Sequence, residues 1–134
     1  MSQENVDTVR AALKALEEGD VDAMLEFCSP GIEYRVRHDL PDARTYHGHN
    51  GIRALAAEWQ RLFADFHLEA EELIDAGDTV VALMRISGRG TTSGVETGNP
   101  YAAVHSVRDG HLWRIIDYPT KDEALEAAGL SEQG

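Results

Sequence analysis

An aspartate at the end of an alternating apolar segment is the residue of this sequence best suited to chemistry. Trp113, Ile115 and Asp117 are spaced two apart, so a strand would place all three on one face. Because burial disfavours the charged form, a carboxyl group held among apolar side chains has a raised pKa. Asp117 could therefore give and take a proton near neutral pH. Alternatively, Asp117 lies at a strand end in contact with water, or caps the helix expected from Thr120.

Aromatic side chains could line a pocket for a flat apolar ligand around such an acid. The candidates are Tyr34, Trp59, Phe63, Tyr101 and Tyr118, together with Trp113 on the predicted face of Asp117. For Trp59 and Phe63, which share a helical stripe, ordinary core packing is the more frequent role. His38 follows the first expected strand, near where a pocket mouth could lie, and could contact a ligand. A solvent-exposed loop histidine is the alternative.

The histidines and the cysteine offer weaker chemistry. His47 and His49 would lie on one side of a strand, as two metal ligands could. A metal site needs a third and usually a fourth ligand, and no matching pair accompanies these two. We therefore expect no metal. Cys28, the single cysteine, has no basic residue beside it and is expected to be a small core residue rather than a nucleophile.

The composition indicates one globular domain spanning residues 1–134. The net charge of -12 disfavours nucleic acid and anionic membrane surfaces, because both attract clustered Lys and Arg. One cysteine allows no internal disulfide, and the polar first residues do not form a signal peptide. We therefore expect a cytoplasmic protein.

The N-terminal half predicts three helices and one strand. One helical stripe contains Val6, Val9, Leu13 and Leu16. Gly19 would end this helix, and Asp20 would cap a second one over residues 21–28. The segment 29–31 is expected to stop that helix before a strand at residues 32–36. A third helix is expected from Asn50 to Asp65.

The C-terminal half changes to a period of two, which is typical of strands. Strands are expected at residues 66–70, 79–87 and 95–107. A break in the last one is expected near Pro100, because proline cannot donate to a ladder. This order predicts an α+β fold whose curved, mostly antiparallel sheet wraps around the N-terminal helices. Such a sheet closes like a cone and leaves a hollow between sheet and helices, where a site is expected.

A hairpin and a final helix complete the expected fold. Asp109-Gly110 predicts a two-residue turn. In the register set by that turn, His105 lies opposite Arg114, on the face away from Asp117. Thr120 has the spacing of a capping box and would open a helix that Gly129 ends.

Several segments together resemble the nuclear transport factor 2-like superfamily, and within it the SnoaL-like branch named for polyketide cyclases. They are residues 9–23, 46–52, 76–78 and 108–110, with an ending at 122–130 similar to a tail common in bacterial members. The resemblance covers nearly the whole chain and implies a cone-shaped, cystatin-like roll. It is specific for fold and weak for function, because this fold hosts isomerases, cyclases, hydrolases, dehydratases and binding modules.

The resemblance also allows known chemistries to be compared residue by residue. Ketosteroid isomerase relatives carry a tyrosine donor where this chain has Ala12, and a catalytic aspartate near Arg35 or Val36. Their second acidic donor corresponds to Ala102 or Ala103. Proton transfer and oxyanion stabilisation need these side chains, so that isomerisation is not expected.

Two other relatives bear on the choice of site residues. Limonene epoxide hydrolase relatives use an arginine and an aspartate where the best alignment gives Met84 and Ile86. The case for epoxide hydrolysis by this chain is therefore weakened too. Met84 remains a candidate for lining a pocket. SnoaL-like cyclases and epoxide hydrolases carry an acid on the final strand, which corresponds approximately to Asp117.

Two functions remain open at this point. The first is a cofactor-free enzyme that uses Asp117 for acid/base chemistry on a small, mostly apolar molecule. The second is a non-catalytic pocket that binds such a molecule, or a dimerisation module with a vestigial pocket. The resemblance further implies a homodimer formed through the outer face of the sheet.

Overall fold

The computed structural model describes residues 2–38, 44–90 and 96–130. Within these ranges, four helices and six strands follow one another along the chain. In order they are α1 (Ser2–Glu17), α2 (Val21–Leu25), β1 (Cys28–Arg35), β2 (Thr45–His47), α3 (Gly48–Leu62), β3 (Phe63–Asp75), β4 (Thr79–Gly90), β5 (Glu96–Arg108), β6 (His111–Tyr118) and α4 (Lys121–Ala127).

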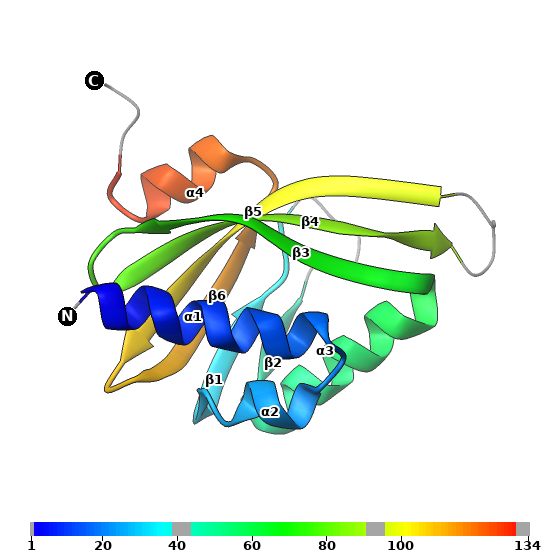
Figure 1. The fold of residues 1–134 in the computed structure, drawn as a ribbon, viewed down its shortest axis with the longest axis horizontal. Coiled ribbons are helices and arrows are strands. Elements are labelled where there is room, and N and C mark those ends of the chain that lie inside the picture. Colours follow the sequence, from blue (N-terminus) through cyan, green and yellow to red (C-terminus); the bar gives the residue numbers. More distant parts are fainter. Residues whose placement is uncertain (1, 39–43, 91–95, 131–134) are drawn as a thin grey trace.

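The strands form one curved sheet in the order β2-β1-β6-β5-β4-β3. Only β1 and β6 are parallel neighbours, and the other described pairs are antiparallel. Helices α1, α2 and α3 lie on one side of this sheet, and α4 lies on the other (Figure 1). The predicted α+β fold with a curved, mostly antiparallel sheet is confirmed.

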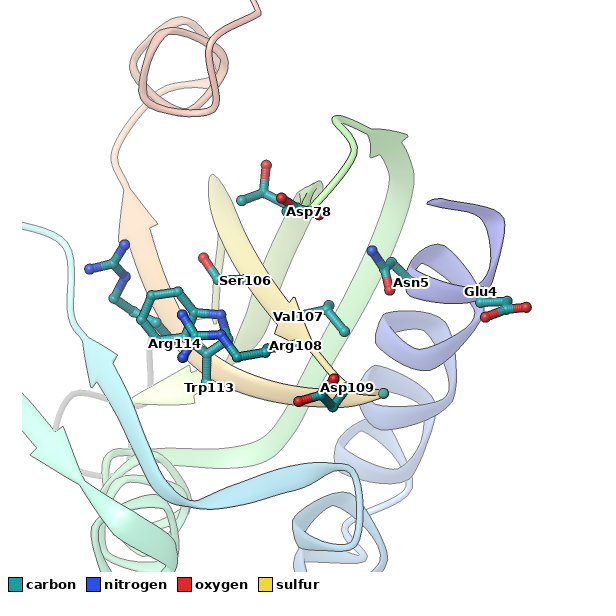
Figure 2. A pocket seen from close by; sticks show the side chains of 11 residues that line it. Glu4, Asn5, Asp78, Ser106, Val107, Arg108, Asp109, Trp113 and Arg114 are labelled. Atoms are coloured by element: carbon teal, nitrogen blue, oxygen red, sulfur yellow. The ribbon is translucent and has the colours of Figure 1, made fainter. Parts of the chain in front are cut away.

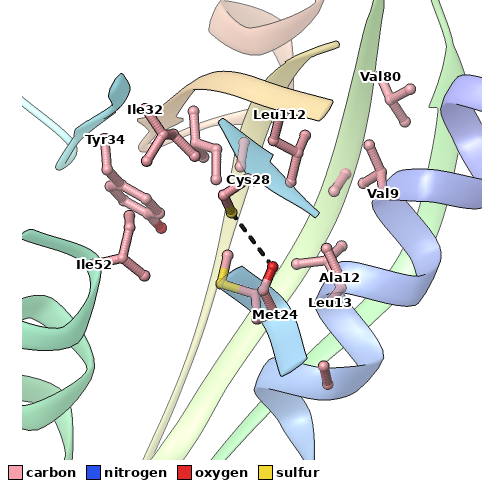
Figure 3. Close-up of a cluster of buried hydrophobic side chains, with 14 of the residues drawn as sticks. Val9, Ala12, Leu13, Met24, Cys28, Ile32, Tyr34, Ile52, Val80 and Leu112 are labelled. Atoms are coloured by element: carbon pink, nitrogen blue, oxygen red, sulfur yellow. Dashed lines mark hydrogen bonds between the residues drawn. The ribbon is translucent and has the colours of Figure 1, made fainter. Parts of the chain in front are cut away.

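Each face of the sheet has its own apolar core. The inner core, under α1 to α3, includes the buried side chains of Val9, Leu13, Met24, Ile32, Ile52, Met84, Leu112 and Ile115. The outer core, under α4, consists of Val81, Ala102, Val104, Ala124 and Leu125. Alternation along β4 and β5 explains this division, because successive side chains point to opposite faces. The predicted hydrophobic stripe of the first helix is therefore an inner-core stripe (Figure 3).

The predicted corner between the first two helices is present. Gly19 has a φ of +77°, a left-handed conformation that glycine adopts without steric cost. The Asp20 side chain then accepts a hydrogen bond from the Ala23 N–H at 3.0 Å. Cys28 follows α2, and its thiol donates to the Met24 carbonyl at 3.5 Å (Figure 3). Its burial raises the pKa of the thiol to about 12, which keeps it unreactive.

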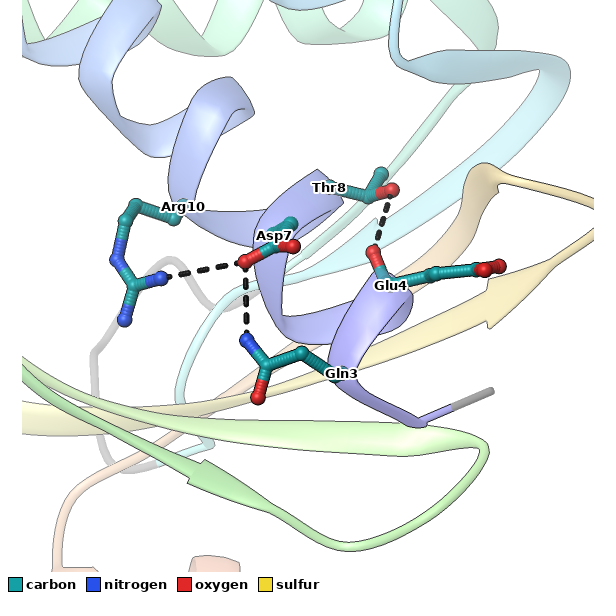
Figure 4. Close-up of polar contacts among 5 residues, drawn as sticks. All are labelled: Gln3, Glu4, Asp7, Thr8 and Arg10. Atoms are coloured by element: carbon teal, nitrogen blue, oxygen red, sulfur yellow. Dashed lines mark hydrogen bonds and ion pairs between the residues drawn. The ribbon is translucent and has the colours of Figure 1, made fainter.

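The exposed side of α1 is held by local polar contacts (Figure 4). Asp7 accepts hydrogen bonds from Gln3 at 3.0 Å and from Arg10 at 3.5 Å, and the Thr8 hydroxyl donates to the Glu4 carbonyl. These contacts join residues three or four positions apart on one helix face. Within the described ranges, no helix is both long and apolar enough to cross a membrane.

Several predicted boundaries in the N-terminal half were wrong. Helix α2 ends at Leu25, and the segment 29–31 lies inside β1, where the pairing with β6 is irregular between Cys28 and Glu33. Helix α3 begins at Gly48 rather than at Asn50 and ends at Leu62. A short strand, β2, pairs with β1 before α3 and was not expected. With three residues, β2 is too short to show the alternating pattern by which a strand is predicted from sequence.

The strand β4 extends further than predicted, and β5 lacks the interruption expected near Pro100. Gly88 and Gly90 belong to β4, and β5 continues through Pro100 without a break. Pro100 lies opposite Arg85 on the β4 side. On the other side, the pairing of β5 with β6 starts only at Ala102. Proline is tolerated here because this part of β5 is not paired with β6, so the missing N–H costs no ladder hydrogen bond on that side. Residues 91–94 of the expected glycine-rich connection lie outside the described part.

The β5–β6 hairpin has the predicted turn but a different register beyond it. Asp109 and Gly110 both have positive φ, as a two-residue hairpin turn requires. Val107 pairs with Leu112, yet Ser106 pairs with Arg114, so Trp113 is an extra residue on β6. This β-bulge shifts the register by one residue. The predicted pair of His105 with Arg114 was therefore wrong.

Candidate functional site

The candidate site is built around Asp117, at the end of β6. Its side chain is 4% exposed and lies on the inner face of the sheet. The Tyr34 hydroxyl, from the neighbouring parallel strand β1, donates to the carboxylate, with distances of 3.0 Å to Oδ1 and 2.9 Å to Oδ2. Ala103, which is buried in the inner core, stands opposite Asp117 on β5. A carboxyl group is thus held among apolar neighbours by one neutral donor.

Burial and hydrogen bonding act on Asp117 in opposite directions. Burial raises the pKa of Asp117 to about 7. The hydrogen bond from Tyr34 and the positive charge of Arg37 both oppose this increase, but burial is the larger effect. At neutral pH the buried group is therefore divided between its acid and its base form. A group in this condition can transfer a proton in either direction.

Tyr101 extends the cluster from β5. It is buried, and a hydrogen bond to Tyr34 influences the pKa of both hydroxyl groups. Burial, followed by the nearby Asp117 charge, raises the pKa of both tyrosines well above the ordinary value. Both phenols therefore stay protonated and can act as hydrogen-bond donors. Met84 on β4 lies directly opposite Tyr101 and is buried in the same core.

Helix α3 brings Trp59 to the cluster. The rings of Trp59 and Tyr34 meet edge to face, with centroids 6.2 Å apart and planes at 78°. Trp59 is partly exposed, whereas Tyr34 is buried. The start of α3 packs closely on β2, since a Cβ added to Gly51 would lie 3.1 Å from the Tyr46 backbone. Glycine at this position lets the helix approach the strand and so places Trp59.

Two predicted ligand-binding residues are not brought to Asp117. His38 is exposed, and its Nε2 lies 2.9 Å from the Glu123 carboxylate on α4. Trp113 is displaced by the β-bulge and stacks with Arg108 and Arg114 at the outer face of the hairpin. The prediction that Trp113 shares the face of Asp117 was wrong, because it assumed unbroken alternation along β6.

His105 shows the converse error. It pairs with Ile115 and lies on the inner face, the same face as Asp117, rather than the opposite one. It is buried, and burial lowers the pKa of its imidazole to about 4. Hydrogen bonding to the backbone of Val80 and Ala103 acts in the other direction but is the smaller effect. His105 is therefore neutral at physiological pH.

The described residues offer no metal cluster of three or more His, Cys, Asp and Glu side chains. His47 ends β2, whereas His49 lies in the first turn of α3 with its Nε2 3.1 Å from the Cys28 carbonyl. The prediction that the two imidazoles share one face of a strand was therefore wrong. Arg37 was missed as a partner of Asp117, and no sequence signal identified it, since it follows the end of β1.

A curved sheet with three helices on its inner face, where Asp117 is buried, makes this a small α+β protein. The model of the SnoaL-like domain family matches residues 9–115, and the chain belongs to this family. No curated protein matches the chain significantly.

Solved structures share the fold at low sequence identity. An NTF2-like protein from Burkholderia thailandensis E264 has a TM-score of 0.79 and 24% identity, covering 92% of this chain and 95% of that one. TerC, co-crystallised with polyporic acid, has a TM-score of 0.76 and 20% identity, covering 94% and 98%. A protein from Jannaschia sp. CCS1, named as a SnoaL-like polyketide cyclase, has a TM-score of 0.75 and 20% identity, covering 99% and 95%.

Proposed function

We propose that this protein binds a small, mostly apolar molecule between the inner face of the sheet and the helices, and that Asp117 transfers a proton on it without a cofactor. The observation that carries the proposal is the Asp117 carboxyl group, buried on the inner face and hydrogen-bonded by Tyr34, where burial raises its pKa to about 7. An acid with a pKa near the working pH is an efficient general acid or base. The Tyr34 hydroxyl orients this group, and Trp59 and Met84 supply apolar surface nearby.

Asp117 also has hydrogen-bonding capacity to spare. A carboxylate offers about four acceptor positions, and the single Tyr34 hydroxyl can satisfy only part of them. Buried polar groups in folded proteins are otherwise nearly always satisfied. A ligand that presents a hydroxyl or an acidic C–H to Asp117 would complete its partners. This argument supports contact between Asp117 and a ligand, which proton transfer requires.

The test is turnover by the whole protein with an Asp117 variant. Polyporic acid and polyketide compounds are the first to try, because TerC was co-crystallised with polyporic acid and the Jannaschia protein is named as a polyketide cyclase. Asp117→Asn keeps the shape of the side chain but cannot transfer the proton, so kcat/KM is expected to fall by about a hundredfold or more. Asp122→Asn, an exposed change on α4, is the matched control and keeps the wild-type rate.

The outcomes separate catalysis from binding. If Asp117→Asn converts a confirmed substrate at the wild-type rate, proton transfer by Asp117 is excluded. If a compound binds but is recovered unchanged, and Asp117→Asn alters only its affinity, the protein is a binding module instead. A homodimer formed through the outer sheet face and a cytoplasmic location stay predictions. Helix α4 covers part of that outer face, so the dimer would use the remainder.

A further inference from the structure

A second group of polar residues, which does not include Asp117, lies at the tip of the β5–β6 hairpin. A hollow of about 520 Å³ opens there between the hairpin, the start of α1 and the β3–β4 turn. Trp113, Arg108, Arg114 and Ser106 contribute from the hairpin (Figure 2). We call this cavity the Trp113 hollow. It opens at the hairpin end of the sheet, where α1 begins, whereas Asp117 lies near the opposite end of β6.

Two arginines in the Trp113 hollow are held by one indole ring. The guanidinium carbons of Arg108 and Arg114 each lie 4.5 Å from the centre of the Trp113 ring. Such stacking orients a guanidinium while leaving its edge free for hydrogen bonds. The β-bulge creates the arrangement, because the extra residue on β6 puts Trp113 beside Arg114 on the outer surface.

These arginines have no carboxylate partner among the described residues, although the chain has 24 acidic residues and only 12 Lys and Arg. Arg114 Nε is buried and makes no hydrogen bond. Other described arginines, such as Arg85 with Glu71, do have an acidic partner. Two oriented guanidinium groups in one hollow are therefore left with unused donors, which match the oxygens of an anion.

The charge around the hollow narrows the class of anion. Glu4, Asp78 and Asp109 also line it, so a multiply charged ligand such as phosphate would be repelled. A single carboxylate can accept bidentate hydrogen bonds from a guanidinium with less repulsion. The Ser106 hydroxyl lines the same hollow and could donate one more. We propose that the Trp113 hollow is a binding site for a small organic molecule with one carboxylate group.

The experiment follows the indole N–H signal of Trp113 by NMR while sodium benzoate is added to the full chain. Trp59→Phe assigns this signal, because the chain has two tryptophans. Benzoate is expected to shift the signal saturably, and uncharged benzamide, which has the same shape, is not. Phosphate at equal ionic strength is expected to bind at least tenfold more weakly than benzoate.

Arginine variants locate the site. Arg114→Gln and the more exposed Arg108→Gln are each expected to weaken benzoate binding by about tenfold or more. Arg85→Gln removes an equal charge from β4, outside the hollow, and leaves the affinity unchanged. The proposal is overturned if benzamide shifts the signal as benzoate does, if both hollow variants bind like the wild type, or if phosphate binds more tightly. Asp117→Asn keeps benzoate binding, so this test does not depend on the proposed function.

Discussion

At the scale of single residues, the hydroxyl group of Tyr34 has the largest effect on the carboxyl group of Asp117 after burial itself. Its hydrogen bond favours the charged carboxylate and so holds the pKa of Asp117 lower than burial alone would. Tyr34→Phe removes this donor with little change of shape. We expect the pKa of Asp117 to rise above about 7, by roughly one pH unit, given the strength of a hydrogen bond to a charged group.

Carbon-13 NMR of the carboxyl groups across a pH titration measures this change, and Asp117→Asn identifies the signal. Tyr118→Phe is the matched control, because Tyr118 is next in sequence but lies with the outer core. Loss of the Tyr118 hydroxyl group is expected to leave the titration of Asp117 unchanged. An Asp117 that titrates identically in Tyr34→Phe and in the wild type would show that the hydrogen bond does not set its pKa.

The sequence identified part of this cluster by residue type. Asp117, Tyr34, Trp59 and Met84 were all candidates, and the structure gathers them on the inner side of the sheet. Trp113 failed because a β-bulge leaves no mark on a pattern of apolar residues. The roles proposed for the four gathered residues in binding and catalysis stay predictions.

At the scale of elements, α4 depends on the cap at its start. The Thr120 side chain accepts a hydrogen bond from the Glu123 N–H at 3.2 Å. Thr120→Ala leaves this N–H unsatisfied, so the free energy of unfolding is expected to fall by about 1 kcal/mol. Urea denaturation measures it. Glu126→Ala, an exposed change on the same helix, is expected to stay within about 0.5 kcal/mol of the wild type. Equal loss in both variants would contradict a specific role for the cap.

Elements marked by strong local chemistry could be predicted from the sequence, and those set by long-range pairing could not. Gly19-Asp20, Asp109-Gly110 and the Thr120 cap each act within a few residues, and each is present in the structure. The strand β2 and the passage of β5 through Pro100 depend on which neighbour each strand has. Pairing partners are decided by the whole sheet, so a local pattern cannot reveal them.

At the scale of the whole molecule, two buried titratable groups on the inner face oppose each other in the pH dependence of stability. The pKa of Asp117 is raised from 3.8 to about 7, so the folded state holds its proton more tightly. Its stabilising contribution is complete below pH 3.8 and is lost as the pH rises to about 7. The pKa of His105 is lowered from 6.5 to about 4, so its contribution is complete above pH 6.5 and is lost as the pH falls.

These contributions amount to about 4 kcal/mol for Asp117 and about 3 kcal/mol for His105, at 1.36 kcal/mol for each pH unit between folded and unfolded pKa values. In the wild type they largely cancel between pH 4 and pH 6.5. Asp117→Asn removes only the first, so its free energy of unfolding is expected to rise more steeply with pH than that of the wild type. His105→Gln removes only the second and is expected to lose stability as the pH rises.

Urea denaturation of both single variants and of the double variant, from pH 4.5 to pH 8, tests this opposition. The double variant is expected to keep only the gradual change caused by the other acidic groups of a chain with a net charge of -12. Since every protein in the series carries those groups, differences between the curves isolate Asp117 and His105. Parallel curves for the wild type and both single variants would mean that neither buried group titrates differently in the folded state. The buried acid would then lose the property on which its proposed role in proton transfer depends.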